Sequence, residues 1–517
     1  MTALAQQVQA PDIGYAEVSP MLIVFGAAVL GVLVEAFLPR AMRYVAQVGL
    51  AMLALIGALV AVVLLAGTER VAGAGSVAVD GPTLFLQGTV LVLSIASLLL
   101  IAERNTEAAG GAFAAQASTI PGSSQERTAV AAGLVQTEVF PLTLFAVGGM
   151  LLFPASNDLL TMFVALEVLS LPLYLMCGLA RRRRLLSQEA ALKYFLLGAF
   201  SSAFFLYGIA LLYGYAGTVE LAGIAEATGA KVGQDALLLI GTALVGVGLL
   251  FKIGAAPFHA WTPDVYQGAP TPVTAFMAAC TKVAAFGALL RVFYVALPGI
   301  RWDWQPMVWF VAILTMVFGA VVAIVQTDVK RMLAYSSIAH AGFILTGLVV
   351  TSGEGLSSTM FYLLVYGFTT LGAFAVVTLV RDAGGEATHL SRWAGLGRRS
   401  PLVAGVFALF LLALAGIPLT SGFTGKFAVF SAAVEGDATA LVIVGVLSSA
   451  IAAFFYVRVI VLMFFSDPVD EGPTVVVPSP LTTAAIAMGV AVTVILGVLP
   501  QPVLDLADRA AAEMFIR

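Results

Sequence analysis

The stretch from Leu249 to Tyr266 reads LLFKIGAAPFHAWTPDVY and places a lysine inside an apolar segment that breaks soon afterwards. Lys252 is surrounded by apolar and small residues, and Gly254 and Pro257 follow it closely. Proline removes a backbone hydrogen-bond donor and clashes with the preceding helical turn. A helix that contains Lys252 is therefore expected to break beside the lysine. A charge next to a helix break in an apolar segment is unusual and indicates a functional role for one or both.

The rest of the 517-residue chain is strongly apolar, with 61% hydrophobic and 10% charged residues. Soluble proteins carry about 25% charged residues. The apolar runs are about 20 residues long and lack polar alternation, which is typical of membrane-spanning helices and not of a β-barrel. The composition therefore excludes a soluble protein and predicts an all-α polytopic membrane protein.

Apolar windows of about 20 residues predict fourteen membrane spans. The spans cover residues 19–38, 44–66, 82–102, 136–153, 157–180, 188–216, 235–260, 271–297, 304–326, 328–350, 356–380, 400–434, 438–465 and 480–500. The longest polar connection, 103–136, is rich in Ala, Gly and Ser and is predicted to be a flexible surface loop. Residues 501–517 are predicted to contain a short interfacial helix.

The placement of lysine and arginine predicts the orientation, because short cytoplasmic loops carry an excess of these residues. Of the 25 basic residues, fifteen fall on one side of the spans, six on the other and four inside spans. The fifteen are Arg40, Arg43, Arg104, Arg127, Arg181, Arg182, Arg183, Arg184, Lys330, Arg331, Arg381, Arg392, Arg398, Arg399 and Arg458. The six are Arg70, Lys231, Arg291, Arg301, Arg509 and Arg517. Both termini are therefore predicted to lie outside, on the periplasmic side of a bacterial plasma membrane.

Five ionisable residues are predicted to lie well inside the hydrocarbon region: Glu167, Lys252, Lys282, His340 and Lys426. A charge at the centre of a span costs about 2.5–3.5 kcal/mol on insertion scales. Desolvation favours the neutral form of a buried lysine, whereas a nearby carboxylate favours the charged form. A lysine beside a mobile carboxylate can therefore gain and lose a proton, and a line of such groups predicts a proton relay.

Structural interpretations stay open for these residues. Glu167 and Lys252 would then form a static ion pair, although such a pair is often no more stabilising than an apolar replacement. His340 would be a neutral histidine bonded to a helix backbone.

Three further residues near the break are candidates for proton uptake. His259 and Asp264 lie on its cytoplasmic side, where they either deliver protons or cap a loop. Lys193 lies close to the basic face, so it either takes part in proton uptake or extends its ammonium group to the interface.

A second predicted span, 400–434, is also broken, at Gly416 and Pro418. Broken helices at matching positions of two halves are typical of transport sites in inverted repeats. The two breaks are five spans apart, so spans 4–8 and 9–13 are predicted to form two inverted five-helix repeats. The chain is then divided into an N-terminal three-helix segment with a cytoplasmic loop, two repeats, and a last span with a short tail. These parts cover residues 1–135, 136–297, 298–465 and 466–517.

Three long motifs resemble those of a known family. They are FKIGAAPFHAWTPDVYQGAPTPVTAFMAACTKVAAF at Phe251 to Phe286, VKRMLAYSSIAHAGFIL at Val329 to Leu345, and AGIPLTSGFTGKFAVF at Ala415 to Phe430. They resemble the antiporter-like subunits of respiratory complex I and of the Mrp-type sodium/proton antiporters. The resemblance covers about residues 136–465, and the short chain with Lys426 in the second broken span looks most like the subunit N type.

The resemblance implies a proton path in which Glu167 pairs with Lys252, Lys282 passes charge along the centre, and His340 bridges toward Lys426. It implies that this chain holds no redox cofactor or metal. FMN, iron–sulfur clusters and quinone are expected in partner subunits, which include neighbouring antiporter-like and small membrane subunits. No nucleic-acid partner is expected.

Other functions stay open at this point. A subunit of a Mrp-type antiporter would use the same spans and charges. A stand-alone transporter of a small organic substrate would work as an isolated chain. A purely structural anchor for a redox arm is disfavoured, because an anchor does not need charges at the centre of its spans.

Overall fold

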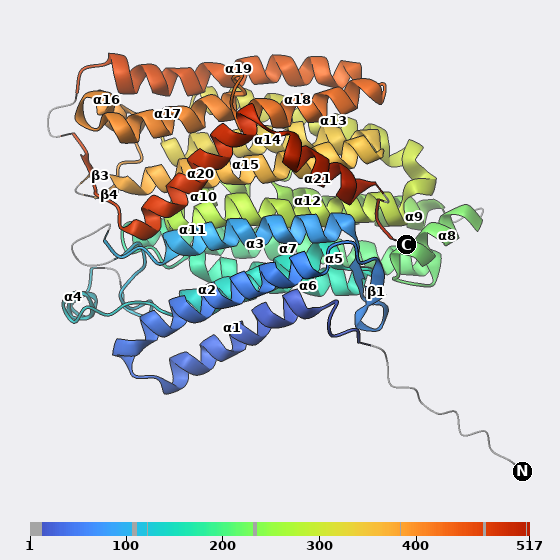
Figure 1. Ribbon diagram of the computed structural model, residues 1–517, viewed down its shortest axis with the longest axis horizontal. Coiled ribbons are helices and arrows are strands. Elements are labelled where there is room, and N and C mark those ends of the chain that lie inside the picture. Colours follow the sequence, from blue (N-terminus) through green and yellow to red (C-terminus); the bar gives the residue numbers. More distant parts are fainter. Residues whose placement is uncertain are drawn as a thin grey trace, which may run out of the picture.

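The computed structural model describes residues 13–105, 111–120, 122–230, 235–382, 384–468, 472–512 and 514–516. Long helices lie roughly side by side along the longest axis of the molecule (Figure 1). Among the described residues, twelve helices are long and apolar enough to cross a membrane. The predicted all-α polytopic membrane fold is therefore confirmed. Two of the basic residues used to predict the orientation, Lys231 and Arg517, lie outside the described residues.

The spanning helices follow one another along the whole chain. They are α1 (Ser19–Phe37), α2 (Arg40–Leu64), α3 (Gly81–Ile101), α6 (Leu159–Cys177), α7 (Arg184–Ala216), α9 (Asp235–Ile253), the helix Thr271–Ala296, α13 (Arg301–Ile324) with the turn η4 (Pro298–Ile300), α14 (Val329–Val350), α15 (Gly353–Leu379), α19 (Thr439–Phe465) and α20 (Pro480–Val498). The helix Thr271–Ala296 consists of α11 (Thr271–Phe276), the π-helical turn η2 (Met277–Thr281), α12 (Lys282–Arg291) and the π-helical turn η3 (Val292–Ala296).

The two other predicted spans correspond to shorter apolar helices. Residues 136–153 form α5 (Val139–Ala155), and residues 400–434 form α17 (Pro401–Ala415) and α18 (Ser421–Glu435). The remaining helices are α4 (Ser124–Ala131), α8 (Leu221–Ala230), α10 (Trp261–Gly268), α16 (Leu396–Arg399), α21 (Gln501–Ala511) and the turns η1 (Gly73–Gly75) and η5 (Leu390–Trp393). The count of fourteen spans, the inverted relation of the repeats and the four-part division stay predictions.

The centre of the bundle is formed by helices that other helices cover on all sides. The helix Thr271–Ala296 is completely buried in its most apolar stretch, and α14 and α15 are 94% buried there. The corresponding stretches of α1, α2, α19 and α20 are only 28–33% buried. Lys282 and His340 therefore lie on central helices, whereas the peripheral helices turn apolar side chains outward, as expected for contact with lipid.

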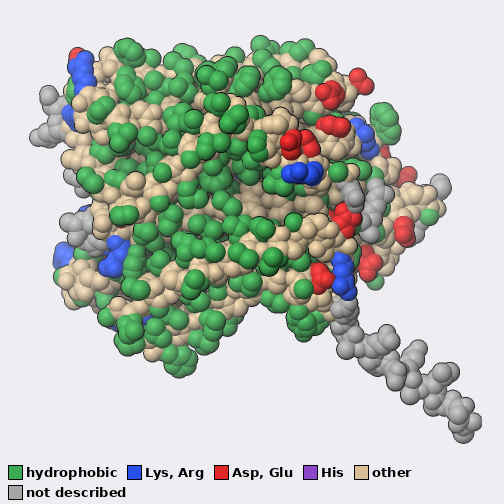
Figure 2. All heavy atoms as spheres, viewed as in Figure 1, with side chains coloured by type: hydrophobic (Ala, Val, Ile, Leu, Met, Phe, Trp, Pro, Cys, Tyr) green, Lys and Arg blue, Asp and Glu red, His purple; other side chains and the backbone are tan. Residues whose placement is uncertain are grey.

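The two ends of the bundle differ in structure and charge. One end carries the hairpin of β1 (Arg70–Ala72) and β2 (Val77–Val79); the other carries a three-stranded antiparallel sheet of β4 (Gly385–Glu386), β3 (Val380–Asp382) and β5 (Thr474–Val475), in that order. The sequence did not predict these short strands. On the visible face, apolar side chains cover the middle, lysine and arginine lie at both ends, and most aspartate and glutamate lie at the hairpin end (Figure 2).

The prediction of a flexible loop over residues 103–136 is wrong for its described parts. Arg184 donates hydrogen bonds to Thr119 Oγ1 at 3.0 Å, the Ala117 carbonyl at 2.9 Å and Glu126 Oε1 at 2.9 Å. The backbone N–H of Gly122 and the Arg184 guanidinium hold the pKa of Glu126 below its ordinary value. Arg184, the last residue of the arginine run, therefore anchors this segment. Residues 106–110 and 121 of the loop lie outside the described residues.

The second helix break follows directly from its glycine and proline. In a continuous helix the Leu414 carbonyl would accept from the N–H of residue 418, but that residue is a proline and has none. The Lys426 ammonium donates to this carbonyl at 3.0 Å and to the Ala415 carbonyl at 3.1 Å. Gly416 ends α17 with φ +84°, and a Cβ there would lie 3.0 Å from Lys426 Cδ. At the break, Lys426 therefore donates hydrogen bonds to carbonyls that have no N–H partner within the helix.

The first break is built in a similar way beside Lys252. Gly254 has φ +75°, and a Cβ there would lie 2.9 Å from Thr262 Oγ1. The Thr315 hydroxyl accepts from Ala256 N at 3.0 Å, and Trp261 Nε1 donates to the Phe251 carbonyl at 2.9 Å. Side chains from α10 and α13 thus supply the contacts that the broken helix lacks.

Replacement of Arg184 by alanine tests the anchoring of the loop. Loss of three hydrogen bonds should free the segment around α4, so trypsin should cleave after the exposed Arg127 faster in membrane vesicles. We expect a rate increase of about tenfold, which corresponds to about 1.4 kcal/mol of lost local stability. Arg398→Ala is the control, because Arg398 pairs only with the exposed Asp467 in the described chain. Equal cleavage of both variants would contradict the anchoring.

Replacement of Gly416 by alanine tests the second break. Alanine at φ +84° costs about 1–2 kcal/mol and would also displace Lys426. We expect a melting temperature of the purified complex below that of the wild type. Gly405→Ala, inside α17, is the matched control, because a Cβ there meets no neighbour and should be neutral or stabilising. The same melting temperature for both variants would show that the break tolerates a side chain.

Candidate functional site

Lys252 lies at the end of α9 and is 4% exposed. Its ammonium group donates to Ser170 Oγ at 2.7 Å and to Tyr194 Oη at 3.2 Å, and it lies 5.3 Å from the centre of the Tyr194 ring. Ser170 in turn donates to the Leu166 carbonyl on α6. Neutral oxygens and an aromatic face therefore stabilise the ammonium group, a weaker compensation than a bound carboxylate would give.

Glu167 lies on α6, one turn before Ser170, and acts on Lys252 through space. Among the described residues no ion pair joins the two, so the direct contact implied by the resemblance is not present in this arrangement. Glu167 Oε1 is buried and has no hydrogen-bond partner in the described chain. Ser170, and not Glu167, therefore supplies the oxygen bound at 2.7 Å to the Lys252 ammonium group in this arrangement.

Lys282 is the first residue of α12 and follows the π-helical turn η2. Its ammonium group donates to both the carbonyl and the hydroxyl of Ser337, each at 2.6 Å, and it lies 5.2 Å from the centre of the Tyr366 ring. Such π-helical turns occur mostly at functional sites. Sequence reasoning missed Ser337 and Tyr366, although the serine pair in VKRMLAYSSIAH was part of a motif that it singled out.

His340 lies on α14 and contacts two tyrosines of α15. Its Nδ1 lies 2.8 Å from Tyr362 Oη, and its ring centre lies 5.1 Å from that of Tyr366. Both Lys282 and Lys426 act on it electrostatically. His340 is therefore linked electrostatically to both lysines, and its bridging role between them stays a prediction.

Lys426 lies on α18, beyond the second break, and is 5% exposed. Besides the two carbonyls of α17, its ammonium group donates to Ser449 Oγ at 2.9 Å and lies 4.9 Å from the centre of the Phe343 ring. It lines an open groove of about 570 Å³ between α18 and α19 whose other walls are mostly apolar. The last carbonyls of α17 form the negative end of its helix dipole, which favours a cation beside them.

The three residues proposed for proton uptake do not form one group. Asp264 Oδ2 binds Lys193 at 2.8 Å, and Asp264 Oδ1 binds Arg331 at 2.6 Å. Lys193 also pairs with Glu189 at 2.7 Å. His259 instead packs on Phe318, with ring centres 4.5 Å apart, and its buried Nδ1 has no hydrogen-bond partner in the described chain. Asp264 thus ties α7, α10 and α14 together, which agrees with the structural interpretation left open for it.

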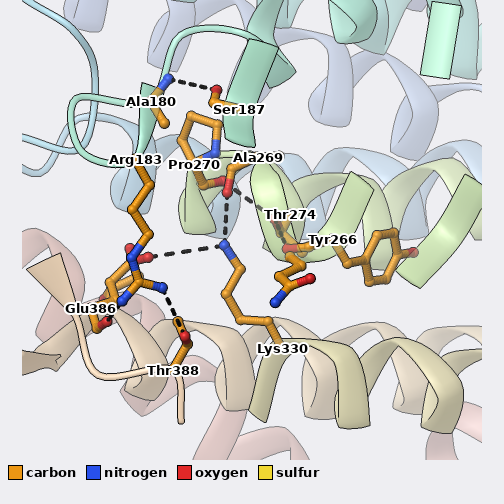
Figure 3. Close-up of polar contacts among 12 residues, drawn as sticks. Ala180, Arg183, Ser187, Tyr266, Ala269, Pro270, Thr274, Lys330, Glu386 and Thr388 are labelled. Carbon is orange, nitrogen blue, oxygen red and sulfur yellow. Dashed lines mark hydrogen bonds and ion pairs between the residues drawn. The ribbon is translucent and has the colours of Figure 1, made fainter. Parts of the chain in front are cut away.

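Lys330 is a buried lysine that sequence reasoning counted only as a basic loop residue. It is the second residue of α14 and is 1% exposed. Its ammonium group donates to the Ala269 carbonyl at 2.7 Å and lies 3.9 Å from Glu386 Oε2 (Figure 3). Arg183 donates to Thr388 Oγ1 and to the Glu386 carbonyl. These contacts fasten the β3–β4 hairpin to the end of α10.

Arg291 and Asp80 form a buried ion pair near the opposite end of the bundle. Arg291 Nη2 lies 2.7 Å from Asp80 Oδ2, and the two side chains are 0% and 1% exposed. Arg291 Nε donates to the Pro154 carbonyl at 2.6 Å, and the Phe515 ring packs on the guanidinium. The sequence placed Arg291 near an outer loop and gave no signal for its partner.

The five ionisable residues are called the central line below: Glu167 acts on Lys252, and Lys282 and Lys426 act on His340, whereas a continuous path from Lys252 to Lys282 stays a prediction. Ser170, Ser337, Tyr366 and Tyr362 lie between or beside them. Within the described chain no group of histidine, cysteine and acidic residues could hold a metal ion. The arrangement is suited to moving a small cation or a proton between buried groups.

Comparison with known proteins agrees with this arrangement. Residues 156–452 match the family model described as NADH:quinone oxidoreductase/Mrp antiporter, TM. The NADH-quinone oxidoreductase subunit N of Rhodococcus opacus (strain B4) is 71% identical, covering 98% of this chain and 98% of the relative. The subunit N of Mycobacterium tuberculosis (strain ATCC 25618 / H37Rv) is 61% identical, covering 97% and 98%.

Solved structures show the same fold. A chain of respiratory complex I from Thermus thermophilus with bound aureothin is 35% identical, with a TM-score of 0.76, covering 95% of this chain and 99% of that one. A chain of the Mrp complex from Dietzia sp. DQ12-45-1b has a TM-score of 0.78 over 96% of this chain and 97% of that one, but at 22% identity it shows the fold alone. The chain thus belongs to the NADH:quinone oxidoreductase/Mrp antiporter family and, within it, to the subunit N group of NADH-quinone oxidoreductases.

Proposed function

We propose that this chain is the proton-translocating membrane subunit of a multi-subunit NADH:quinone oxidoreductase. The observation that carries the proposal is the line of buried ionisable residues from Glu167 to Lys426 through the centre of the bundle. A charge buried in a membrane span is costly and marks an ion pathway or proton relay by default. The strong identity to subunit N chains favours this assembly over a Mrp-type antiporter, which remains the alternative.

The proposed mechanism begins with a charge change next to Glu167. Quinone chemistry in neighbouring subunits changes the charge that faces this carboxylate, and Glu167 moves toward or away from Lys252. With the carboxylate close, the ammonium form of Lys252 is favoured; with it distant, desolvation favours the neutral amine. Lys252 then passes a proton toward Lys282, and His340 carries it to Lys426 for release on the outer face.

The broken helices have a defined part in this mechanism. The Leu414 and Ala415 carbonyls and the Ser449 hydroxyl hold the charged form of Lys426 without a carboxylate. Ser170 and Tyr194 do the same for Lys252. Because no carboxylate is bound to either ammonium, loss of the proton leaves no unpaired anion behind, and both protonation states are accessible.

The chain itself is proposed to carry out no redox chemistry. FMN, iron–sulfur clusters and quinone belong to partner subunits in this proposal, and neighbouring antiporter-like and small membrane subunits are its direct partners. It lies in the bacterial plasma membrane with both termini outside. The excess of lysine and arginine on one side of the predicted spans, fifteen against six, supports this orientation.

Proton pumping by the assembled complex tests the proposal. Loss of a positioned proton carrier slows proton transfer by about 100-fold or more. We therefore expect Lys252→Ala, Glu167→Ala and Lys426→Ala to lower the number of protons translocated per NADH in vesicles. Arg458→Gln is the control, because it removes a surface cation that only donates to the Ile324 carbonyl. Wild-type stoichiometry in all three variants, at wild-type assembly, would refute the proposal.

A further inference from the structure

The orientation of the His340 ring depends on one hydrogen bond. Its Nδ1 lies 2.8 Å from Tyr362 Oη, and the two side chains are 2% and 0% exposed. Its Nε2 is buried and has no hydrogen-bond partner in the described part of the chain. The bond made by one imidazole nitrogen sets the protonation of the other. In the described chain, Tyr362 is therefore the hydrogen-bond partner that orients the His340 ring.

The available nitrogen lies in a region that both neighbouring lysines reach. Lys282 and Lys426 act on the His340 ring from α12 and α18. The Leu414 carbonyl, which accepts from Lys426 at 3.0 Å, also lies close to His340. The Tyr366 ring contacts both the Lys282 ammonium group and the His340 ring. A proton on Nε2 would thus lie between a donor and an acceptor of the relay.

Close packing fixes the Tyr362 ring itself. A Cβ added to Gly425 on α18 would lie 2.9 Å from Tyr362 Cδ2, so glycine at this position lets α18 approach the ring. Gly425 directly precedes Lys426 in the sequence. The same close approach therefore sets both the position of the Tyr362 hydroxyl and the distance of Lys426 from His340.

We propose that Tyr362 is a positioning residue that keeps His340 Nε2 turned toward Lys282 and Lys426. Its hydroxyl accepts Nδ1–H, so the lone pair of the neutral ring lies on Nε2. A proton leaves the Lys282 ammonium group and binds Nε2, and the imidazolium then gives this proton to the neutral amine of Lys426. Tyr362 exchanges no proton. This inference rests on the proposed function, because it requires proton transfer along the line.

Other titratable groups near His340 come from α10, α12, α15, α18 and α19. They are Lys282 on α12, Lys426 on α18, Tyr362 and Tyr366 on α15, Tyr266 near Ser337 on the α10 side, and Tyr456, which bonds Ser336, on α19. No carboxylate is among them. The Tyr362 hydroxyl is therefore the neutral acceptor that supports a charged His340 ring.

The test is the pH profile of proton pumping by the assembled Tyr362→Phe complex in liposomes. Phenylalanine keeps the packed ring and removes only the acceptor for Nδ1–H. The charged imidazolium is then less stable, so we expect the alkaline limit of pumping to move to lower pH by about one unit. Tyr294→Phe is the matched control: it removes a buried tyrosine hydroxyl that lies 3.2 Å from the Ser352 carbonyl, and its profile should match the wild type.

A double variant separates positioning from a general effect on packing. If Tyr362 acts through His340, Tyr362→Phe should change nothing further in a His340→Ala complex. The inference would be overturned if Tyr362→Phe had the pH profile of the wild type. It would also be overturned if Tyr362→Phe lowered pumping as much in the His340→Ala complex as it does when His340 is present. The Lys426→Ala complex, measured in parallel, separates the role of Tyr362 from the proposed function of the chain. If Lys426→Ala loses pumping and Tyr362→Phe does not change it, only the role of Tyr362 is overturned. If Lys426→Ala pumps as the wild type does, the proposed function is refuted.

Discussion

Each of the three lysines of the central line is buried without a carboxylate bound to its ammonium group. Lys252 is met by two hydroxyls, Lys282 by a carbonyl and a hydroxyl of one serine, and Lys426 by two carbonyls and a hydroxyl. Neutral oxygens satisfy the N–H donors, but they do not compensate the charge as an anion does. This balance leaves the charged and neutral forms of a buried lysine close enough in free energy for a neighbouring charge to decide between them.

The supply of these neutral oxygens explains much of the architecture. Backbone carbonyls inside a helix normally accept hydrogen bonds from the same helix. A helix bundle therefore supplies neutral oxygens to a buried side chain where a helix is broken, through freed carbonyls, or where a helix carries serine, through its hydroxyl. Pro418 frees the Leu414 carbonyl for Lys426, and the serines of α6 and α14 serve the other two lysines. Helix breaks and serines therefore meet the same requirement, which is to supply hydrogen-bond acceptors to a buried ammonium group.

The sequence predicted the membrane fold, both helix breaks and the five ionisable residues of the line, because costly charges and helix-breaking residues stand out in an apolar chain. It did not predict the partners. Ser170, Ser337 and Tyr362 look like ordinary residues of a buried helix, and only the packing of distant segments brings them to Lys252, Lys282 and His340. Lys330 and Arg291 lie near the ends of the predicted spans 328–350 and 271–297, so they were counted with the basic residues of the two faces and not with the buried charges. The anchoring of residues 111–120 and 122–131 by Arg184 depends on contacts far apart in the chain and has no local pattern.

The buried pair of Arg291 and Asp80 also constrains the order of folding. Asp80 Oδ2 accepts from the backbone N–H of Ile516, which is made more than four hundred residues later, and Phe515 covers the Arg291 guanidinium. Asp80 enters the membrane region with α3, long before these groups exist. The end of the bundle that holds this pair therefore cannot close completely until the last spanning helix has been made. Its closure is a late event of folding, which completes the contacts of a residue synthesised near the beginning.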